Sequence, residues 1–247
     1  MRRRVGDGLR VVFLGTAGAG GFPGRAQNCL LVEASWGRVL LDAGPGCGAR
    51  LVEQGYSVCD LDVVYVSHLH LDHWSGLFDL AVQAISHGCG FPPVLAAGGV
   101  AADARERIRS LLPRTVNVEV RMLEETLYNG KLTPVESSHT IPCYGVIVAD
   151  GGLRLYYSAD TRPTARARDA VASSDLAALE ATFPPGRERE AHGSGHMTVS
   201  DAAGIAPENW EGTLALIHLS TESMKSLKHY RLPRKLIVPG DHTEVRI

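Results

Sequence analysis

The feature that most constrains this chain is a dense group of metal-binding residue types between positions 68 and 73. His68, His70, Asp72 and His73 follow an apolar run that ends at Val66. Alternate residues of an extended segment share one face, so His68 and His70 can point the same way. The turn that follows can bring Asp72 and His73 to a second point nearby. Imidazole and carboxylate groups suit divalent ions such as Zn(II), Mn(II) or Fe(II), and the segment therefore predicts a metal site at a strand end.

The composition is that of a globular protein with a substantial core. The chain has 247 residues, of which 45% are hydrophobic and 21% are charged. Its formal net charge of -2 argues against a strongly basic surface for nucleic acid. No apolar run approaches the roughly 18 residues that a membrane span needs, so we expect no membrane partner.

The cysteines and the start of the chain favour a cytoplasmic protein. An odd number of cysteines without CxxC spacing argues against a disulfide framework or a cysteine zinc finger, and for a reducing compartment. These cysteines are Cys29, Cys47, Cys59, Cys89 and Cys143. Arg2, Arg3 and Arg4 precede a short apolar run, as in a signal peptide, but residues 15–21 interrupt that run at once. We therefore expect a first strand followed by a loop.

Short aliphatic runs alternate with helical segments along the whole chain. Strands are expected at 9–14, 28–33, 38–41, 61–67, 116–120, 145–149, 153–158, 176–179, 214–218 and 236–238. Helices are expected at 75–86, 101–112, 164–172, 200–206 and 221–228. Thr198 or Ser200 could cap the helix at 200–206. Such alternation predicts α/β layers.

The pattern HxHxDH resembles the signature of the metallo-β-lactamase superfamily, and the other motifs of that superfamily occur here in order. They are Leu41-Asp42-Ala43-Gly44, Ser138-His139-Thr140, Ser158-Ala159-Asp160-Thr161 and Ile217-His218-Leu219-Ser220. The resemblance covers essentially the whole chain. It implies a four-layer αββα sandwich that forms a single domain over residues 1–247. Its two halves, roughly 1–125 and 126–247, would each supply one sheet and its helices.

The resemblance also implies a centre of two divalent metal ions, with Zn(II) the first choice. The ligands would be His68, His70 and His139 at the first ion, Asp72, His73 and His218 at the second, and Asp160 between them. Asp42 would orient a ligand histidine by a hydrogen bond. Two cations beside one water lower its pKa from 15.7 toward about 7, which provides a hydroxide nucleophile. His242 competes with His218 for the last ligand position, and the context after an apolar strand favours His218.

Several segments resemble the ribonuclease Z-like branch, whose members cleave phosphodiesters. They are Phe13–Gly18 with Arg25 and Asn28, the segment 138–145, Glu180-Ala181-Thr182-Phe183, and Gly195-His196-Met197-Thr198. Leu179 and Met197 replace a histidine and a serine of that branch. By this resemblance His196 protonates the leaving group, Glu180 is its acidic partner, and Asp72 joins them as a catalytic residue. The alternative is that Glu180 and His196 only pack the domain.

One departure from that branch bears on the substrate. The long arm that grips tRNA is missing, because the interval from Tyr144 to Ser158 holds only a hairpin with its turn at 149–152. We therefore expect a small phosphodiester or nucleotide, such as a cyclic phosphate, although RNA stays possible. The basic clusters at 2–4, 105–109 and 162–168 are interpreted as solvated faces. The family analogy also allows a homodimer.

Rival functions differ in the bond that is cleaved. One alternative is an endoribonuclease that processes the 3′ end of tRNA. Others are hydrolases of thioesters, lactones or sulfate esters, against which the segments of Glu180 and His196 argue. A non-enzymatic metal-binding scaffold is the alternative from a different class, and the complete ligand set argues against it.

Overall fold

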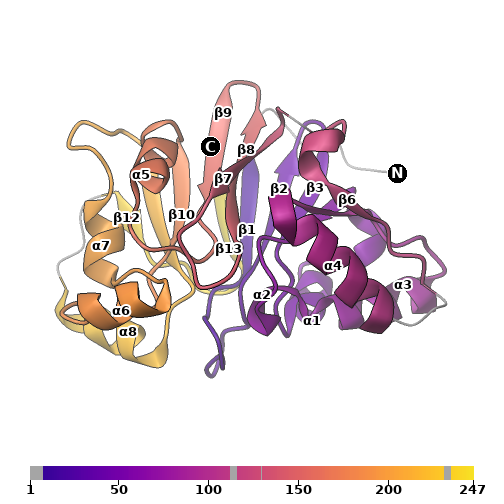
Figure 1. The fold of residues 1–247 in the computed structure, drawn as a ribbon, viewed down its shortest axis with the longest axis horizontal. Helices are drawn as coiled ribbons and strands as arrows, with labels where there is room; N and C mark the ends of the chain where they lie inside the picture. Colours follow the sequence, from indigo (N-terminus) through magenta and orange to yellow (C-terminus); the bar gives the residue numbers. More distant parts are fainter. Residues whose placement is uncertain (1–7, 112–115, 129, 231–234) are drawn as a thin grey trace.

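The structure is a computed structural model that describes residues 8–111, 116–128, 130–230 and 235–247. Two β-sheets lie face to face at its centre (Figure 1). The first sheet has the order β13(Thr243–Arg246), β1(Arg10–Gly15), β2(Cys29–Ala34), β3(Gly37–Leu41), β4(Val63–Tyr65), β5(Val94–Ala96) and β6(Val120–Met122). The second has the order β12(Leu236–Ile237), β11(Thr213–Ile217), β10(Leu176–Glu180), β9(Leu153–Tyr157), β8(Tyr144–Asp150) and β7(Leu132–Glu136).

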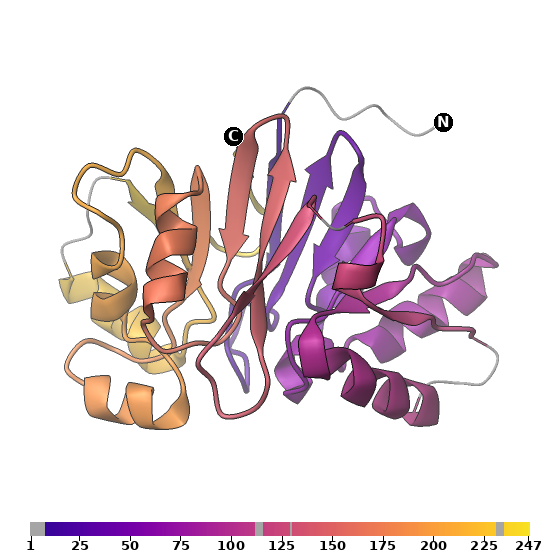
Figure 2. The same ribbon diagram turned by 45° about the horizontal axis from the view of Figure 1, so that its top comes forward.

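Helices cover the outer face of each sheet, which gives the four layers expected from the sequence (Figures 1 and 2). On the side of the first sheet lie α1(Cys47–Glu53), η1(Val58–Asp60), α2(Leu71–Trp74), α3(Leu77–His87), α4(Gly98–Leu111) and η2(Leu123–Glu125). On the side of the second lie α5(Ala165–Ala172), α6(Glu188–Ser194), α7(Val199–Gly204), α8(Thr221–Ser226) and η3(Leu227–His229). The expected αββα sandwich is confirmed.

The strands alternate their side chains between an inner core and an outer core, which holds the layers together. On β1, Val11 and Phe13 belong to the core between the sheets, whereas Val12 and Leu14 belong to the core beneath α1 and α3. The period of two residues in a strand produces this division. Because helices cover the outer faces, both sets of strand side chains are buried, and the strands read as continuous apolar runs.

The strand directions bring one end of both sheets to a common edge. Strands β3 to β6 run parallel in the first sheet, as do β9 to β12 in the second. Parallel strands present their carboxyl ends on the same side, where ligands bind in open α/β sheets. The loops that leave β3, β4, β9, β10 and β11 therefore meet at one edge.

Most of the expected elements are found, and the missed ones are short. The sequence did not predict the strands β5, β7 and β13 or the helices α1, α2 and α6, each of which is three to seven residues long. The strand expected at 116–120 lies later, at Val120–Met122. Thr198 caps α7 by accepting a hydrogen bond from the Asp201 amide, as expected.

The C-terminal strand departs from the expected division into halves. β13 pairs antiparallel with β1 and so belongs to the first sheet, although it lies in the second half of the chain. The backbone amides of Leu9 and Ile247 each donate to the other residue's carbonyl, at 3.0 and 3.1 Å. The first sheet is therefore built from both halves of the chain.

The expectation of unpaired cysteines was wrong. Cys29 and Cys47 form a disulfide between β2 and α1, and Cys59 and Cys89 form a second one between η1 and the segment after α3. Only Cys143 is free, and it is buried. The pairs are 18 and 30 residues apart, so the fold and not a local motif brings the sulfur atoms together. The cysteine argument for a reducing compartment therefore fails.

No helix among the described residues is both long and apolar enough to cross a bilayer. The first described strand, β1, is followed by a loop, as expected. The basic cluster Arg2, Arg3 and Arg4 lies outside the described residues. A cytoplasmic location and a homodimer stay predictions.

Candidate metal centre

The predicted site residues gather around one cavity at the common strand edge. Asp42 follows β3, His68 follows β4, Asp160 follows β9 and His218 follows β11. His70 stands immediately before the single-turn helix α2, which carries Asp72 and His73. A cavity of about 410 Å³ opens here, and its lining includes His70, Asp72, Asp160, His196 and His218. Segments as far apart in the chain as Asp42 and His218 thus converge on one site.

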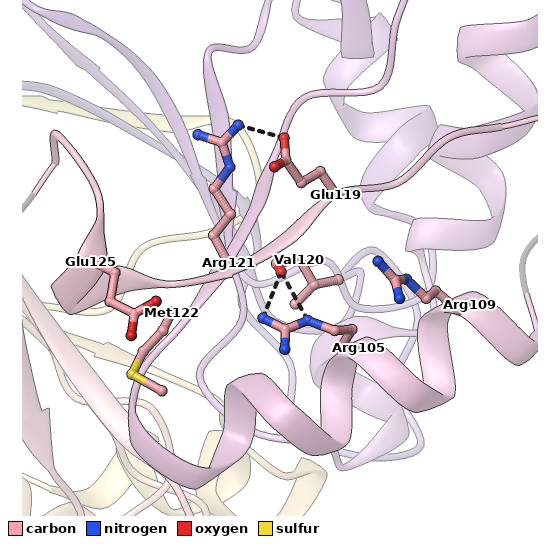
Figure 3. A pocket seen from close by; sticks show the side chains of 7 residues that line it. All are labelled: Arg105, Arg109, Glu119, Val120, Arg121, Met122 and Glu125. Atoms are coloured by element: carbon pink, nitrogen blue, oxygen red, sulfur yellow. Dashed lines mark hydrogen bonds and ion pairs between the residues drawn. The ribbon is translucent and has the colours of Figure 1, made fainter.

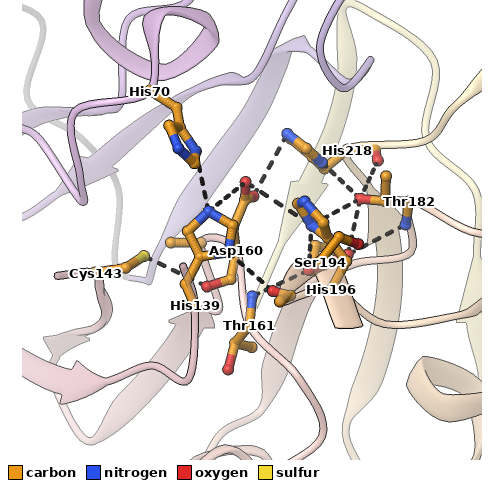
Figure 4. A network of polar contacts seen from close by, with 12 residues as sticks. His70, His139, Cys143, Asp160, Thr161, Thr182, Ser194, His196 and His218 are labelled. Carbon is orange, nitrogen blue, oxygen red and sulfur yellow. Dashed lines mark hydrogen bonds and ion pairs between the residues drawn. The ribbon is translucent and has the colours of Figure 1, made fainter. Parts of the chain in front are cut away.

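The first donor set consists of His68, His70, His139 and Asp160, with one donor atom of each within 4.8 Å of the others. His70 Nδ1 lies 3.0 Å from His139 Nε2. Asp160 Oδ2 lies 3.6 Å from His68 Nε2 and 3.8 Å from His139 Nε2. Figure 4 shows His70 and His139 approaching each other beside Asp160. The set matches the three histidines and the bridging aspartate inferred for the first ion.

The second donor set consists of Asp72, His73 and His218. His218 Nε2 lies 3.1 Å from both His73 Nε2 and Asp72 Oδ2. Asp160 reaches this set with its other oxygen, because Oδ1 lies 3.3 Å from His73 Nε2 and 3.4 Å from His218 Nε2. The two oxygens of Asp160 thus face different donor sets, as a bridging carboxylate must.

The donor atoms are arranged to bind divalent cations, and two of them have no hydrogen-bond partner within the protein. His68 Nε2 and Asp160 Oδ1 are buried and have no hydrogen-bond partner. A buried polar atom without a partner costs free energy, and such an atom in a native site calls for an ion or a water. Imidazole nitrogens and carboxylate oxygens in sets of three or four are the ligands of Zn(II) and related ions. The residues present therefore fit the expected metal ions.

Protonation states in the metal-free chain also suit ligation at the first donor set. Burial lowers the pKa of His68, His70 and His139, so these imidazoles are neutral and keep a lone pair for a metal. Burial also lowers the pKa of His73, but the Asp160 and Asp42 carboxylates outweigh it and raise that pKa well above its usual value. A metal at the second set would therefore displace a proton from His73.

Asp42 contacts the His73 ring at Nδ1, on the side opposite the metal-facing Nε2. Its Oδ2 lies 2.7 Å from His73 Nδ1 and accepts hydrogen bonds from Ser67 Oγ at 2.6 Å and Tyr157 OH at 2.5 Å. Its Oδ1 accepts from the Ser67 amide at 2.7 Å. Such a contact fixes the imidazole ring of His73 and turns its Nε2 toward the ion position. This is the place that the sequence reasoning gave to Asp42.

Two further residues orient ligand histidines, and neither was given a role from the sequence. The Gly195 carbonyl lies 2.9 Å from His139 Nδ1, and Thr182 Oγ1 lies 2.8 Å from His218 Nδ1. In both cases the opposite ring nitrogen is left for the ion. Thr182 belongs to the Glu-Ala-Thr-Phe segment, which was the available signal. A backbone carbonyl such as that of Gly195 gives no sequence signal.

Three residues at the site adopt a backbone conformation that side chains rarely accept. Asp42, Ala159 and His218 have φ values of 57°, 50° and 52°. Each follows directly or within two residues the end of a strand, and each turns the chain sharply at the cavity. Such positions cost about 1–3 kcal/mol and cluster at functional sites, where surrounding contacts hold them.

Glu180 and His196 form a pair at the edge of the same cavity. Glu180 Oε1 lies 2.9 Å from His196 Nδ1 and accepts from the Thr161 amide at 3.0 Å. Burial lowers the pKa of His196, but the charge and hydrogen bond of Glu180 outweigh it and raise that pKa to about 9. Glu180 is fully buried, whereas His196 lines the cavity. The structure therefore brings together the two residues inferred to be an acid and its partner.

The remaining histidines lie away from this cluster. His242, the rival of His218, contacts Gln54 through Nδ1 at 2.8 Å and Glu53 through Nε2 at 2.9 Å. His192 pairs with Asp201 at 2.9 Å. His87 and His229 belong to none of the donor groups found among the described residues.

Each of the two described basic clusters contains an arginine that hydrogen-bonds within the chain. Figure 3 shows Arg105 donating to the Val120 carbonyl, at 3.2 and 3.3 Å, and Arg121 pairing with Glu119 beside it. Arg162 donates to Ser138 Oγ at 3.0 Å, so it supports the loop that carries His139. These contacts agree with the interpretation of charged faces that are not dedicated to RNA.

Comparison with known proteins supports one family. The model of the β-lactamase superfamily domain matches residues 37–219. A protein named Ribonuclease Z from Pyrobaculum arsenaticum is 31% identical, with 94% of this chain and 96% of that relative covered. The metallo-β-lactamase fold protein YhfI from Bacillus subtilis superposes with a TM-score of 0.81, at 22% identity and with 98% and 100% of the two chains covered. A diphosphatase of the PhnP family superposes with a TM-score of 0.77, at 18% identity and with 97% and 98% covered. The chain therefore belongs to the β-lactamase superfamily, in its ribonuclease Z-like branch.

Proposed function

We propose that this chain is a dinuclear metal-dependent phosphodiesterase. The observation that carries the proposal is the position of Asp160, whose two oxygens face separate donor sets in the cavity that His196 also lines. The 31% identity to a protein named Ribonuclease Z over nearly its whole length supports a phosphodiester as substrate. A thioester hydrolase has less use for an acid such as His196 with its partner Glu180, because a thiolate leaves without being protonated.

The metal ions would be held by the two donor sets described above, and Zn(II) is the proposed identity. Bound divalent cations supply a nucleophile from water at neutral pH and neutralise charge on the phosphate. The protein residues fix where this happens. Asp42, Thr182 and the Gly195 carbonyl hold the ligand rings, so the donor atoms are in place before the substrate arrives.

His196 is the proposed general acid. Both of its hydrogen-bonding contacts, with Glu180 and Thr182, fall on Nδ1, which leaves Nε2 for the substrate. In the metal-free chain the raised pKa keeps a proton on this ring at neutral pH. An alkoxide is a poor leaving group near neutrality, so a proton delivered to the leaving oxygen lowers the barrier to P–O cleavage.

The proposed substrate is a small phosphodiester or nucleotide. Strands β8 and β9 are joined by the two-residue turn Gly151-Gly152, whose φ values of 58° and 92° suit the tight hairpin that was predicted. No arm is inserted between these strands, where tRNA-processing relatives would carry one. RNA is the second candidate, and the similarity to a protein named Ribonuclease Z favours it.

The first test is hydrolysis of bis(p-nitrophenyl) phosphate by the purified chain reconstituted with Zn(II), Mn(II) or Fe(II). Chelator-sensitive turnover is expected, together with about two ions per chain by elemental analysis. Absence of turnover with two ions bound would overturn the proposal in favour of a thioester, lactone or sulfate ester. Comparison of a precursor tRNA with a 3′ trailer against a 2′,3′-cyclic nucleotide then separates the two substrate classes.

A further inference from the structure

A second cavity, of about 320 Å³, lies beside the catalytic cavity. Its lining residues are Ala19, Gly21, Phe22, Thr182, Phe183, Leu219, Ser220, Thr221 and Glu222. Three of them, Ala19, Thr182 and Ser220, also line the catalytic cavity. The two spaces are therefore neighbours along one continuous wall, and a substrate held at the metal ligands can extend into the second one.

The second cavity lies on the side of the proposed general acid. His196 lines the catalytic cavity and Phe183 lines the second one, and the centroids of their rings are 6.0 Å apart. A general acid must stand next to the leaving oxygen, because that is the atom it protonates. The group attached to the leaving oxygen therefore extends toward Phe183, whereas the rest of the substrate faces the donor sets.

Two aromatic side chains make this cavity suited to a flat ring. Phe22 and Phe183 both line it, and both are only partly buried. The Arg25 guanidinium lies 5.7 Å from the centroid of the Phe22 ring, and the Arg25 amide donates to the Phe22 carbonyl at 3.0 Å. These contacts hold Phe22 in a defined place at the tip of the loop after β1. Partly exposed aromatic rings serve as stacking surfaces for bases.

The Glu222 carboxylate favours bound rings that carry a hydrogen-bond donor. Glu222 is exposed over 67% of its side chain, and its ion-pair partner Arg187 lies 3.5 Å away. An ionised carboxylate only accepts hydrogen bonds, so it favours a ring that carries an amino group over a ring with a carbonyl at the same position. Adenine and cytosine present such amino groups.

We propose that this second cavity is the subsite for the base of a nucleoside leaving group, with Phe22 and Phe183 as stacking surfaces and Glu222 as the acceptor for an exocyclic amino group. The inference rests on the phosphodiesterase function proposed above and names its substrate class. For a 2′,3′-cyclic nucleotide, water forms a new P–O bond and one ring P–O bond breaks. The released ribose oxygen takes the proton from His196, and the product is a phosphomonoester with the base still in the subsite. The attacking water loses a proton to solvent, and an equivalent proton from solvent returns to His196.

The test compares three five-membered cyclic phosphodiesters in the metal-loaded protein. These are 2′,3′-cyclic AMP, 2′,3′-cyclic IMP, in which a carbonyl replaces the amino group, and ethylene phosphate, which has no base. The wild-type kcat/KM should be highest for cyclic AMP and lowest for ethylene phosphate. Phe22→Ala should lower the ratio of cyclic AMP to ethylene phosphate by about tenfold, since loss of one stacking surface commonly has an effect of this size. Glu222→Gln should reduce the preference for cyclic AMP over cyclic IMP.

The controls separate a stacking role from general damage. Phe22→Leu keeps an apolar side chain without an aromatic face and should lower the same ratio. Val82→Ala removes an exposed apolar side chain from α3, outside both cavities, and should leave all three substrates unaffected. Circular dichroism should show all variants folded.

The failure of this inference can be told from the failure of the proposed function. Turnover of bis(p-nitrophenyl) phosphate without any advantage of cyclic AMP over ethylene phosphate would overturn the base subsite and leave the phosphodiesterase standing. Equal losses on all three substrates in Phe22→Ala would also overturn it. No turnover of any phosphodiester by the wild type would overturn both.

Discussion

At the scale of single residues, the site depends most on Asp160. This carboxylate is 1% exposed, and each of its oxygens lies within 4 Å of a different group of imidazole nitrogens. Burial would raise its pKa, but His218 and His73 lower it well below the usual value. Asp160 therefore stays ionised in the metal-free chain, as a metal-ligating carboxylate must be.

Replacement of Asp160 by alanine should reduce the occupancy of both ion positions. One carboxylate serves both donor sets, so its loss removes a ligand from each. We expect well under two ions per chain by elemental analysis after dialysis, with little hydrolysis left. Glu53→Ala, outside the site, is the control. Full occupancy in the Asp160 variant would exclude the bridging assignment.

Replacement of His196 by alanine should leave the metal content intact. His196 is the proposed acid and is not needed in either principal donor set. We expect kcat to fall by about 10²–10⁴-fold on an alkyl leaving group, the usual range for loss of general acid catalysis. The fall should be much smaller for p-nitrophenolate, which leaves without a proton. Joint loss of metal and activity would show a structural role instead.

The sequence predicted which residues form the site where metal-binding residue types occur together in short motifs. The histidines and aspartates from His68 to His218 that the motifs singled out lie together around one cavity. Thr182, Tyr157 and the Gly195 carbonyl could not be found in this way. Their contacts join residues 36, 115 and 56 positions apart, and only the fold creates them.

At the scale of elements, the ends of strands and helices position the site residues, and Gly195 at the end of α6 is the clearest example. It ends α6 with a φ of 84°, and a Cβ at this position would lie 2.7 Å from His139 Nδ1. Gly193, two residues earlier within α6, has no atom within 4 Å of such a Cβ. These two glycines are a matched pair on one short helix.

Gly195→Ala should therefore disturb the His139 ligand, and Gly193→Ala should not. The strained φ and the contact with the ring predict reduced metal occupancy and lower activity in the first variant. The second should keep both and gain a little stability, because alanine favours a helix over glycine by about 1 kcal/mol. Metal content and thermal unfolding of the two proteins make the comparison. Equal behaviour would contradict the role given to Gly195.

Elements were predictable where the periodic signal is long enough. The strands that became β1, β2, β3, β8, β9, β10 and β11 were expected near their true bounds. The helix α2 was expected only as a turn, because four residues cannot show a helical period. β5 and β13 owe their conformation to pairing with distant strands, which no local pattern reveals.

At the scale of the whole molecule, a charge network ties the strands of the first sheet together. Glu33 on β2 pairs with Arg10 of β1 at 2.6 Å and with Arg38 of β3 at 2.7 Å. Burial would raise the pKa of Glu33, but the hydrogen bonds from Arg38 and Arg10 lower it below its usual value. A lowered pKa in the folded state means that ionised Glu33 stabilises the fold above its unfolded pKa. This stabilisation is lost as the pH falls through the folded pKa.

Glu33→Gln should therefore destabilise the metal-free protein at pH 7 and matter less in acid. The substitution leaves Arg38 without a carboxylate partner and Arg10 with Glu244 alone, at 2.6 Å, which costs about 2 kcal/mol. Urea unfolding at pH 7 and again below pH 4 measures the difference, which should shrink at the lower pH. Glu119→Gln breaks the exposed pair with Arg121 and should leave the unfolding midpoint unchanged. A constant difference between the two pH values would contradict the assignment.

The sequence was least informative about connections across the whole molecule. The two disulfides and the return of β13 to β1 each join segments that carry no matching local signal. Cysteine spacing alone was misleading, because it describes the chain and not the distances in the fold.

The metal-binding residues come from both sheets, so bound metal ions would also affect the stability of the folded protein. His68, His70, Asp72 and His73 come from the loop after β4 of the first sheet, whereas His139, Asp160 and His218 come from loops of the second. Ions bound between them would fasten the two sheets at their open edge, and a ligand that binds only the folded state stabilises it by mass action. In a metal-poor environment, such an enzyme would lose more than turnover. It would unfold more often and become more accessible to proteases, so its lifetime would report the available metal.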